Sequence, residues 1–262
     1  MRKITAVLLA LILILSLTAC GLMEKTETIY VHMRSERTIA GQVIRMEYEY
    51  SPAGTPISVK TYFNDVLYQT ASTRTSGGMT YQTIVDKDGN STTQSTTYTK
   101  DDQGNVVMLE ISVGTTPLSR TRYTYDDQNR MTNSNTVTTL GITDISYSYD
   151  AAGNVAEQIV DDATEKAYTR TVYTYDDRGY VLEEKVYDKD GALTGSIQYT
   201  YGENGLSKTA VFMDAEGKAT GEKVESTYDE HSNLVKEVTT MDGEVVQTII
   251  NTFVAMEVPV EE

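Results

Sequence analysis

Several residue types that mark particular classes of protein are rare or absent in this chain of 262 residues, which has no Trp, 3 Phe, 4 Pro, 2 His and 1 Cys. A single Cys excludes an internal disulfide framework and a cysteine-cluster metal centre. The two histidines, His32 and His231, lie far apart in the sequence. Their number excludes a multi-histidine metal site and leaves little material for a Ser-His-acid triad. We therefore expect no metal and no other cofactor.

Positive charge is also scarce, with 22 Lys+Arg against 38 Asp+Glu and a formal net charge of −16. Such a charge repels phosphate groups, so nucleic-acid binding through a basic surface is not expected. It also keeps a protein soluble and away from anionic lipid headgroups. Any attachment to a membrane would therefore rest on acyl chains.

The amino terminus has the pattern of an export signal. Arg2 and Lys3 precede the apolar run Ile4–Leu17. Its length of about fourteen residues is shorter than the roughly twenty needed to span a bilayer as a helix. We assign residues 1–19 to a signal peptide.

The end of this run, Leu17-Thr18-Ala19-Cys20, resembles a bacterial lipobox. The resemblance implies that the signal peptide is removed and that Cys20 carries the lipid, palmitate included. Gly21 follows, where an Asp in diderm bacteria resembles an inner-membrane retention signal. The expected location is extracytoplasmic: the outer membrane of a diderm host, or the outer leaflet of a monoderm one. The alternative is a signal anchor with an incidental cysteine.

From about residue 38 onward a short phrase recurs with a period of about 25 to 27 residues, which is typical of repeat architectures. Its clearest copies pair two tyrosines with an acidic turn, beginning at Tyr123, Tyr147, Tyr173 and Tyr199, with other copies at Tyr48, Tyr98 and Thr227. A second turn lies midway through each period, as in Asp188-Lys-Asp190-Gly191. Asp at the first position and Gly or Asn three residues later predict a type I turn with a G1 bulge, which makes hairpins.

Between the turns, segments rich in Thr, Val, Ile and Tyr alternate with period two, as β-strands do. No segment beyond the export signal sustains apolar positions at helical spacing. We predict an all-β fold, an antiparallel β-hairpin repeat meander of about seventeen short strands that curls or winds as a spiral sheet.

The phrase Tyr-x-Tyr-Asp-x-x-Gly-Asn, seen as Tyr147-Ser-Tyr149-Asp150-Ala-Ala-Gly153-Asn154, resembles the YD repeat of the Rhs and teneurin family. The resemblance covers roughly residues 40–250 and is strongest over 98–233. It implies β-hairpins wound into a spiral sheet, and in long members a hollow shell. This chain is far shorter than a shell-forming member and has no toxin domain after Phe253. We therefore expect no closed cocoon and do not carry over toxin delivery.

The paired tyrosines would form a ladder on one face of the sheet, where aromatic neighbours stabilise cross-strand packing. This packing role is the simplest interpretation. Tyr in place of Phe indicates a face that is not fully dry, because each hydroxyl needs a partner. The functional interpretation is a platform on which sugar rings stack, with these candidate ligand-binding residues: Tyr125, Tyr149, Tyr175 and Tyr201.

The acidic turns invite a calcium hypothesis, but the spacing does not fit an EF-hand. Asp86, Asp88 and Asn90 are suitably spaced, whereas Ser91 replaces the required Gly and Thr97 the required Glu. Plain turn chemistry is the expected role, and weak surface binding of calcium is the alternative.

Paired carboxylates such as Asp126-Asp127 and Asp176-Asp177 have the chemistry for acid and base catalysis. They recur at every repeat on expected loops, whereas a catalytic pair is normally unique and sheltered. His231 lies in another such turn, where a solvated loop histidine is expected. We therefore expect that the protein is not an enzyme. The alternative, a hydrolase, would need a deep pocket that holds two carboxylates.

These observations divide the chain into a signal peptide (1–19), a lipidated tether (20–37), a repeat domain (38–256) and an acidic tail (257–262). The expected function is a membrane-anchored binding module for carbohydrate or another cell-envelope polymer. The alternative is a structural scaffold on the cell surface that contacts a protein through an exposed edge strand or a second copy. The expected partners are thus the membrane, through the lipid, and a polysaccharide or surface protein.

Overall fold

The computed structural model describes residues 28–202 and 207–258, and their regular structure consists of eighteen β-strands. In chain order they are β1 (Thr28–Ile39), β2 (Gln42–Tyr50), β3 (Pro56–Phe63), β4 (Val66–Ser76), β5 (Met79–Asp86), β6 (Ser91–Lys100), β7 (Val106–Val113), β8 (Thr116–Tyr125), β9 (Met131–Thr138), β10 (Ile142–Tyr149), β11 (Val155–Asp162), β12 (Ala167–Tyr175), β13 (Val181–Tyr187), β14 (Leu193–Tyr201), β15 (Ser207–Asp214), β16 (Ala219–Tyr228), β17 (Leu234–Met241) and β18 (Glu244–Glu257). Over these two ranges, no helix has the length and apolarity required to cross a membrane.

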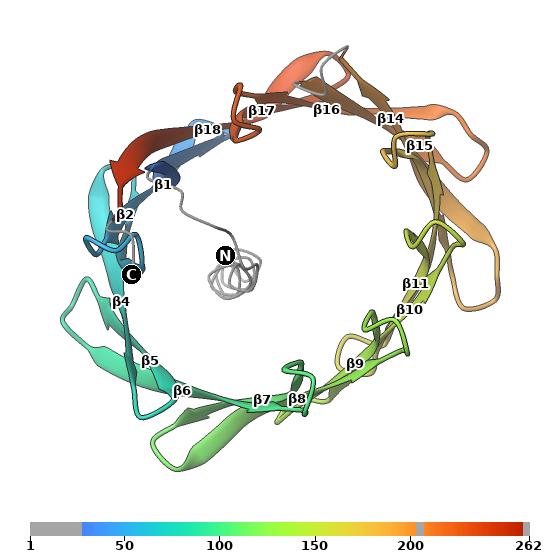
Figure 1. The fold of residues 1–262 in the computed structure, drawn as a ribbon. Coiled ribbons are helices and arrows are strands. Elements are labelled where there is room, and N and C mark those ends of the chain that lie inside the picture. Colours follow the sequence, from blue (N-terminus) through green and yellow to red (C-terminus); the bar gives the residue numbers. More distant parts are fainter. Residues whose placement is uncertain (1–27, 203–206, 259–262) are drawn as a thin grey trace.

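Each strand pairs antiparallel with the next along the chain, and β18 pairs antiparallel with β1. The closing ladder runs from Thr28 opposite Glu257 to Ile39 opposite Gln247. The sheet therefore forms a closed ring (Figure 1). The prediction of an all-β antiparallel hairpin meander is confirmed. The expected curl is present, but the sheet closes into a ring and does not wind as a spiral, because the two terminal strands satisfy each other's backbone groups.

The first strand begins earlier than the sequence pattern indicates. Residues 28–37, assigned to the tether, form most of β1. This strand lacks the repeat phrase and carries charged side chains such as Arg34 and Glu36, which hides its alternation. At the other end β18 extends to Glu257. The signal peptide, Cys20 and residues 259–262 of the acidic tail lie outside the described residues.

The acidic turns have the predicted geometry. At Asp126, the backbone N–H donates to the Arg130 carbonyl at 2.9 Å, and the Asn129 N–H donates to the Asp126 carbonyl at 2.9 Å. The Asp126 Oδ1 accepts the N–H groups of Gln128 and Arg130. Asn129 has φ of 66°, as a G1 bulge requires. The same backbone pair recurs in the turns that begin at Asp86, Asp101, Asp150, Asp176, Asp188, Asp214 and Asp229.

In one of these turns, the residue with a left-handed backbone conformation carries a side chain that disfavours that conformation. Ser232 has φ of 64°, where Gly occupies the corresponding position of most sister turns, such as Gly153. We expect Ser232→Gly to raise the free energy of unfolding by roughly 0.5–1 kcal/mol, because relief of the left-handed strain outweighs the added freedom of the unfolded chain. Urea unfolding measures the change. Gly153→Ser should lower stability by a similar amount, and equal stabilities of all three proteins would contradict the explanation.

The strand alternation gives the ring two chemically distinct faces. On the face that carries the tyrosine pairs, Tyr147 lies opposite Gln158 and Tyr173 opposite Glu184. Most of the buried residues share this face: Ser35, Thr61, Ala71, Thr121, Ser134, Thr171, Ala210 and Ser226. Side chains crowd on the concave side of a curved wall, so we assign this tyrosine face to the inside of the ring.

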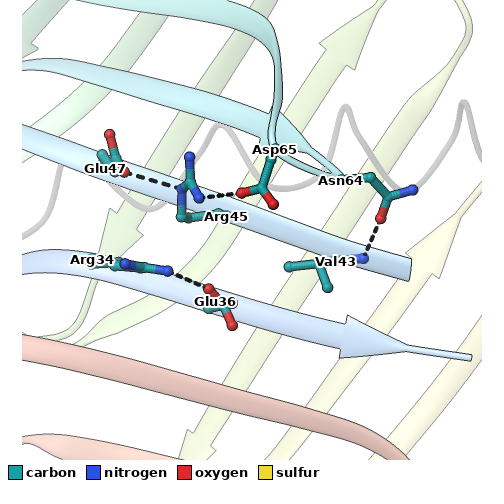
Figure 2. A network of polar contacts seen from close by, with 7 residues as sticks. All are labelled: Arg34, Glu36, Val43, Arg45, Glu47, Asn64 and Asp65. Carbon is teal, nitrogen blue, oxygen red and sulfur yellow. Dashed lines mark hydrogen bonds and ion pairs between the residues drawn. The ribbon is translucent and has the colours of Figure 1, made fainter. Parts of the chain in front are cut away.

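The outer face is polar and charged. Two ion pairs project from it (Figure 2): Arg34 with Glu36 on β1, and Arg45 with Glu47 on β2. Ion pairs at the surface of a protein contribute little to stability. Their main consequence is that the wall presents charge to the surroundings.

The wall is a single layer without a dry core. Among the described residues only three apolar side chains are buried, Val31, Ala71 and Ala210, and none of the large side chains is less than 2% exposed. A ring of this many strands is wide enough to leave an aqueous interior. The tyrosine face is therefore half-buried by its own neighbours and still reached by water.

Candidate binding surface on the inner face

The second tyrosine of each pair fastens its strand to the strand before it. The hydroxyl of Tyr125 donates to the Val106 carbonyl at 2.8 Å, and that of Tyr175 donates to the Val155 carbonyl at 2.7 Å. Tyr149 and Tyr201 make the same bond to Met131 and Val181, at 2.6 and 2.9 Å. Burial raises the pKa of all four phenols. These hydrogen bonds link neighbouring strands, and they fix the orientation of the tyrosine rings.

This fastening also occurs where the tyrosine phrase is missing. On β18 the Asn251 side-chain amide donates to the Leu234 carbonyl at 2.9 Å, at the first residue of β17. The copy of the phrase at Tyr48 keeps the same bond, since Tyr50 on β2 donates to the His32 carbonyl on β1 at 2.9 Å. Asn251 could not be predicted from the sequence, because nothing in its local phrase resembles a tyrosine repeat.

The first tyrosines lie further from the turns on the same face. One of them, Tyr199, donates from its hydroxyl to Glu184 Oε1 at 2.7 Å. Glu184 also lies directly opposite Tyr173 in the ladder between β12 and β13. Burial is the main cause that raises the pKa of Tyr173, Tyr175, Tyr199 and Tyr201, and the Glu184 carboxylate adds to the increase at each. These four tyrosines and Glu184 are termed the Glu184 site.

Cations already lie over some inner rings. The Lys208 ammonium is 4.1 Å from the centroid of Tyr199, and the Arg130 guanidinium is 4.3 Å from that of Tyr149. Arg130 is at the same time paired with Asp126 at 2.7 Å. The tyrosine faces of the inner wall therefore accept positive charge.

The histidines lie near the closure and contact aromatic rings. His32 stacks on Tyr48 and Phe253, with ring centroids 4.7 and 4.8 Å apart, and burial lowers its pKa. His231 is in its predicted turn, and its ring stacks on Tyr30 at 3.8 Å. Over residues 28–202 and 207–258, no group of three His, Cys, Asp or Glu side chains gathers as metal ligands.

The carboxylates of the acidic turns are occupied by their own turns. Asp86 accepts the N–H groups of Asp88 and Asn90 through Oδ1 and the Asn90 amide through Oδ2. In the pair Asp126-Asp127 the first residue is bound in the turn, and the second is exposed. Hydrogen bonds from the Arg130 N–H and side chain lower the pKa of Asp126. These carboxylates are turn elements in this structure.

An apolar patch lies on the outer face at the tips of two hairpins. Leu118, Val137, Leu140 and Ile142 are exposed to 37%, 43%, 81% and 46%. Leu118 and Val137 also line a shallow recess of about 270 Å³ between β8 and β9.

No protein-family model and no curated protein match this chain. A porin-like protein from Bacteroides uniformis is similar in structure, with a TM-score of 0.45 and 11% identity, covering 85% of this chain and 97% of that chain. The structure of TcdB2-TccC3-Cdc42 is similar with a TM-score of 0.39 and 12% identity, over 78% of this chain and 14% of that chain. These TM-scores are all below 0.5, so function rests on the chain's own residues.

Proposed function

We propose that this protein is a non-enzymatic binding module that holds a carbohydrate or another cell-envelope polymer against its inner tyrosine face. The supporting observation is that the tyrosine rings of the ladder have a fixed orientation and are still partly exposed to water. Each second tyrosine is oriented by its bond to a carbonyl, while the single-layer wall leaves its ring only half-buried. Pre-oriented aromatic surfaces bind with little loss of side-chain freedom.

The inner face also supplies polar groups between the rings. Ser134, Gln158 and Glu184 lie opposite Tyr123, Tyr147 and Tyr173 in their ladders. A sugar ring stacked on one tyrosine would find a hydrogen-bonding side chain on the neighbouring strand. An alternation of apolar surface and a few convergent polar groups is typical of ligand sites.

Binding to a polysaccharide panel tests the proposal. Tyr147→Leu should weaken binding roughly tenfold, as expected for the loss of one stacking contact. The matched control is Tyr81→Leu, which removes a ring that lies under Arg74 on the outer face. Equal effects of the two changes, or no binding by the intact protein across a broad panel, would contradict the proposal.

The repeats and the lipobox support a finer assignment to the YD-repeat group of extracytoplasmic lipoproteins. Cys20 is the sole cysteine and therefore the sole thiol able to accept the lipid. We expect Cys20→Ala to abolish incorporation of labelled palmitate and to leave an unprocessed precursor. A variant that still incorporates the label would exclude the lipoprotein assignment, while the parent chain serves as the positive control.

A second candidate function is a protein-interaction scaffold. An exposed edge strand is no longer available for it, because β1 pairs with both β2 and β18. The patch of Leu118, Val137, Leu140 and Ile142 is the observation that favours a protein contact. Glycan binding that survives Leu140→Ser would separate this patch from the inner face.

A further inference from the structure

We propose that the Glu184 site recognises a positively charged amine, so that the polymer held on the inner face is a glycan with free amino groups. This inference rests on the proposed function and names its ligand class. It concerns one sector of the wall, formed by β12, β13 and β14. An N-acetylated glycan, an acidic glycan and a lysine-rich peptide are the alternatives that the experiment separates.

The geometry of the site suits an ammonium ion. Glu184 projects from β13 to the inner face, between the tyrosine pairs of β12 and β14. It accepts one hydrogen bond from Tyr199, which leaves lone pairs of its carboxylate available to another donor. Aromatic rings that surround a carboxylate attract a cation both by charge and by their negatively polarised faces.

Lys208 shows that an ammonium ion is accepted here. Its Nζ lies 4.1 Å from the Tyr199 centroid, and its backbone is in register with Tyr201 on the adjacent strand. The protein thus supplies an amine of its own to one ring of the site. A ligand amine would compete with Lys208 for that ring, or share the site through the opposite pair, Tyr173 and Tyr175.

The charge of the whole molecule favours the same class of ligand. The formal net charge is −16, and acidic turns recur at both ends of the strands. The resulting field concentrates cations near the ring and repels anions. An acidic polysaccharide would meet this repulsion along its length, whereas a glycan with free amines would be attracted.

The experiment measures binding of four probes to the full chain at about pH 6, where Asp and Glu are ionised. The probes are a glucosamine hexamer, the N-acetylglucosamine hexamer of equal length, an oligogalacturonate and hexalysine. We expect the glucosamine hexamer to bind most tightly, with an affinity that falls as salt rises.

Three variants locate the binding. Glu184→Gln should weaken binding of the glucosamine hexamer about tenfold or more, as expected for loss of a charge-assisted contact. Lys208→Met should strengthen binding, because it removes the competing amine. Glu183→Gln is the matched control, since Glu183 is the adjacent residue and pairs with Lys185 on the outer face. Thermal unfolding of each variant checks that the fold is retained.

The outcomes distinguish this inference from the proposed function. Equal affinity for the amine and N-acetylated hexamers, or unchanged binding by Glu184→Gln, would overturn the amine site and leave a glycan-binding module. Binding of hexalysine without any glycan would overturn the glycan as ligand. No binding of any probe, together with no binding across the polysaccharide panel, would overturn both.

Discussion

Removing residues 176–188 from the chain should prevent the ring from closing. This deletion excises β13 with one turn and leaves one strand fewer than the native eighteen. Every strand after the deletion would then run in the opposite direction. The last strand would meet β1 parallel, although the native ladder between β1 and β18 is antiparallel. An antiparallel meander closes on itself only with an even number of strands. We expect exposed edges, loss of the β signal in circular dichroism, and aggregation.

The matched control is removal of residues 176–201, which excises β13 and β14 together. Tyr175 then takes the place of Tyr201 before Gly202, and the strand number stays even. Because each strand contacts only its neighbours, we expect a smaller, soluble and folded ring. Size-exclusion chromatography and circular dichroism compare the two deletions. Equal damage by both, or a soluble folded product from the shorter deletion, would contradict the role assigned to strand parity.

Truncation of a central ladder tyrosine should have the second largest effect. Tyr175→Ala removes a half-buried ring and its bond to the Val155 carbonyl. We expect a loss of about 2–3 kcal/mol in the free energy of unfolding, below the roughly 3–5 kcal/mol of a fully buried aromatic residue. Tyr149→Ala should behave alike, since its bond to Met131 is equivalent. Denaturant unfolding measures both losses.

Two further variants divide this loss into its parts. Tyr175→Phe keeps the ring and leaves the Val155 carbonyl without its donor, which should cost about 1 kcal/mol. Tyr81→Ala on the outer face, where the ring lies under Arg74, should cost clearly less than Tyr175→Ala. If Tyr175→Phe were as damaging as Tyr175→Ala, the ring would contribute nothing. If it were harmless, the hydroxyl bonds would not fasten the strands.

The local structure of this protein could be predicted because each element is encoded by adjacent residues. The turn at Asp126 needs an acidic first position and a residue that tolerates positive φ at Asn129, and both can be read directly. The alternation of Tyr199 and Tyr201 with Thr200 likewise reports a strand with two different faces. Local chemistry repeated at a fixed period is sufficient for a hairpin array.

Closure could not be predicted, because it depends on segments far apart in the chain. Thr28–Ile39 and Glu244–Glu257 carry no phrase that marks them as partners, and Arg37 meets Gln247 only in the folded ring. For the same reason, only part of the candidate site could be predicted from the sequence. The tyrosines form a recognisable pattern in the sequence, whereas the role of Glu184 depends on the strands that pair with β13 on either side. The ligand-binding role of Tyr125, Tyr149, Tyr175 and Tyr201 stays a prediction.

The need for an even number of strands also restricts how the size of such a ring can change during evolution. One period adds two strands, and neighbouring strands lie about 4.8 Å apart, so a duplicated period widens the circumference by roughly 10 Å and the diameter by about 3–4 Å. A fully antiparallel ring takes no intermediate size, since an odd number of strands leaves one parallel pair at the closure. Tandem duplication or loss of the repeat would therefore change the width of the enclosed space in discrete steps.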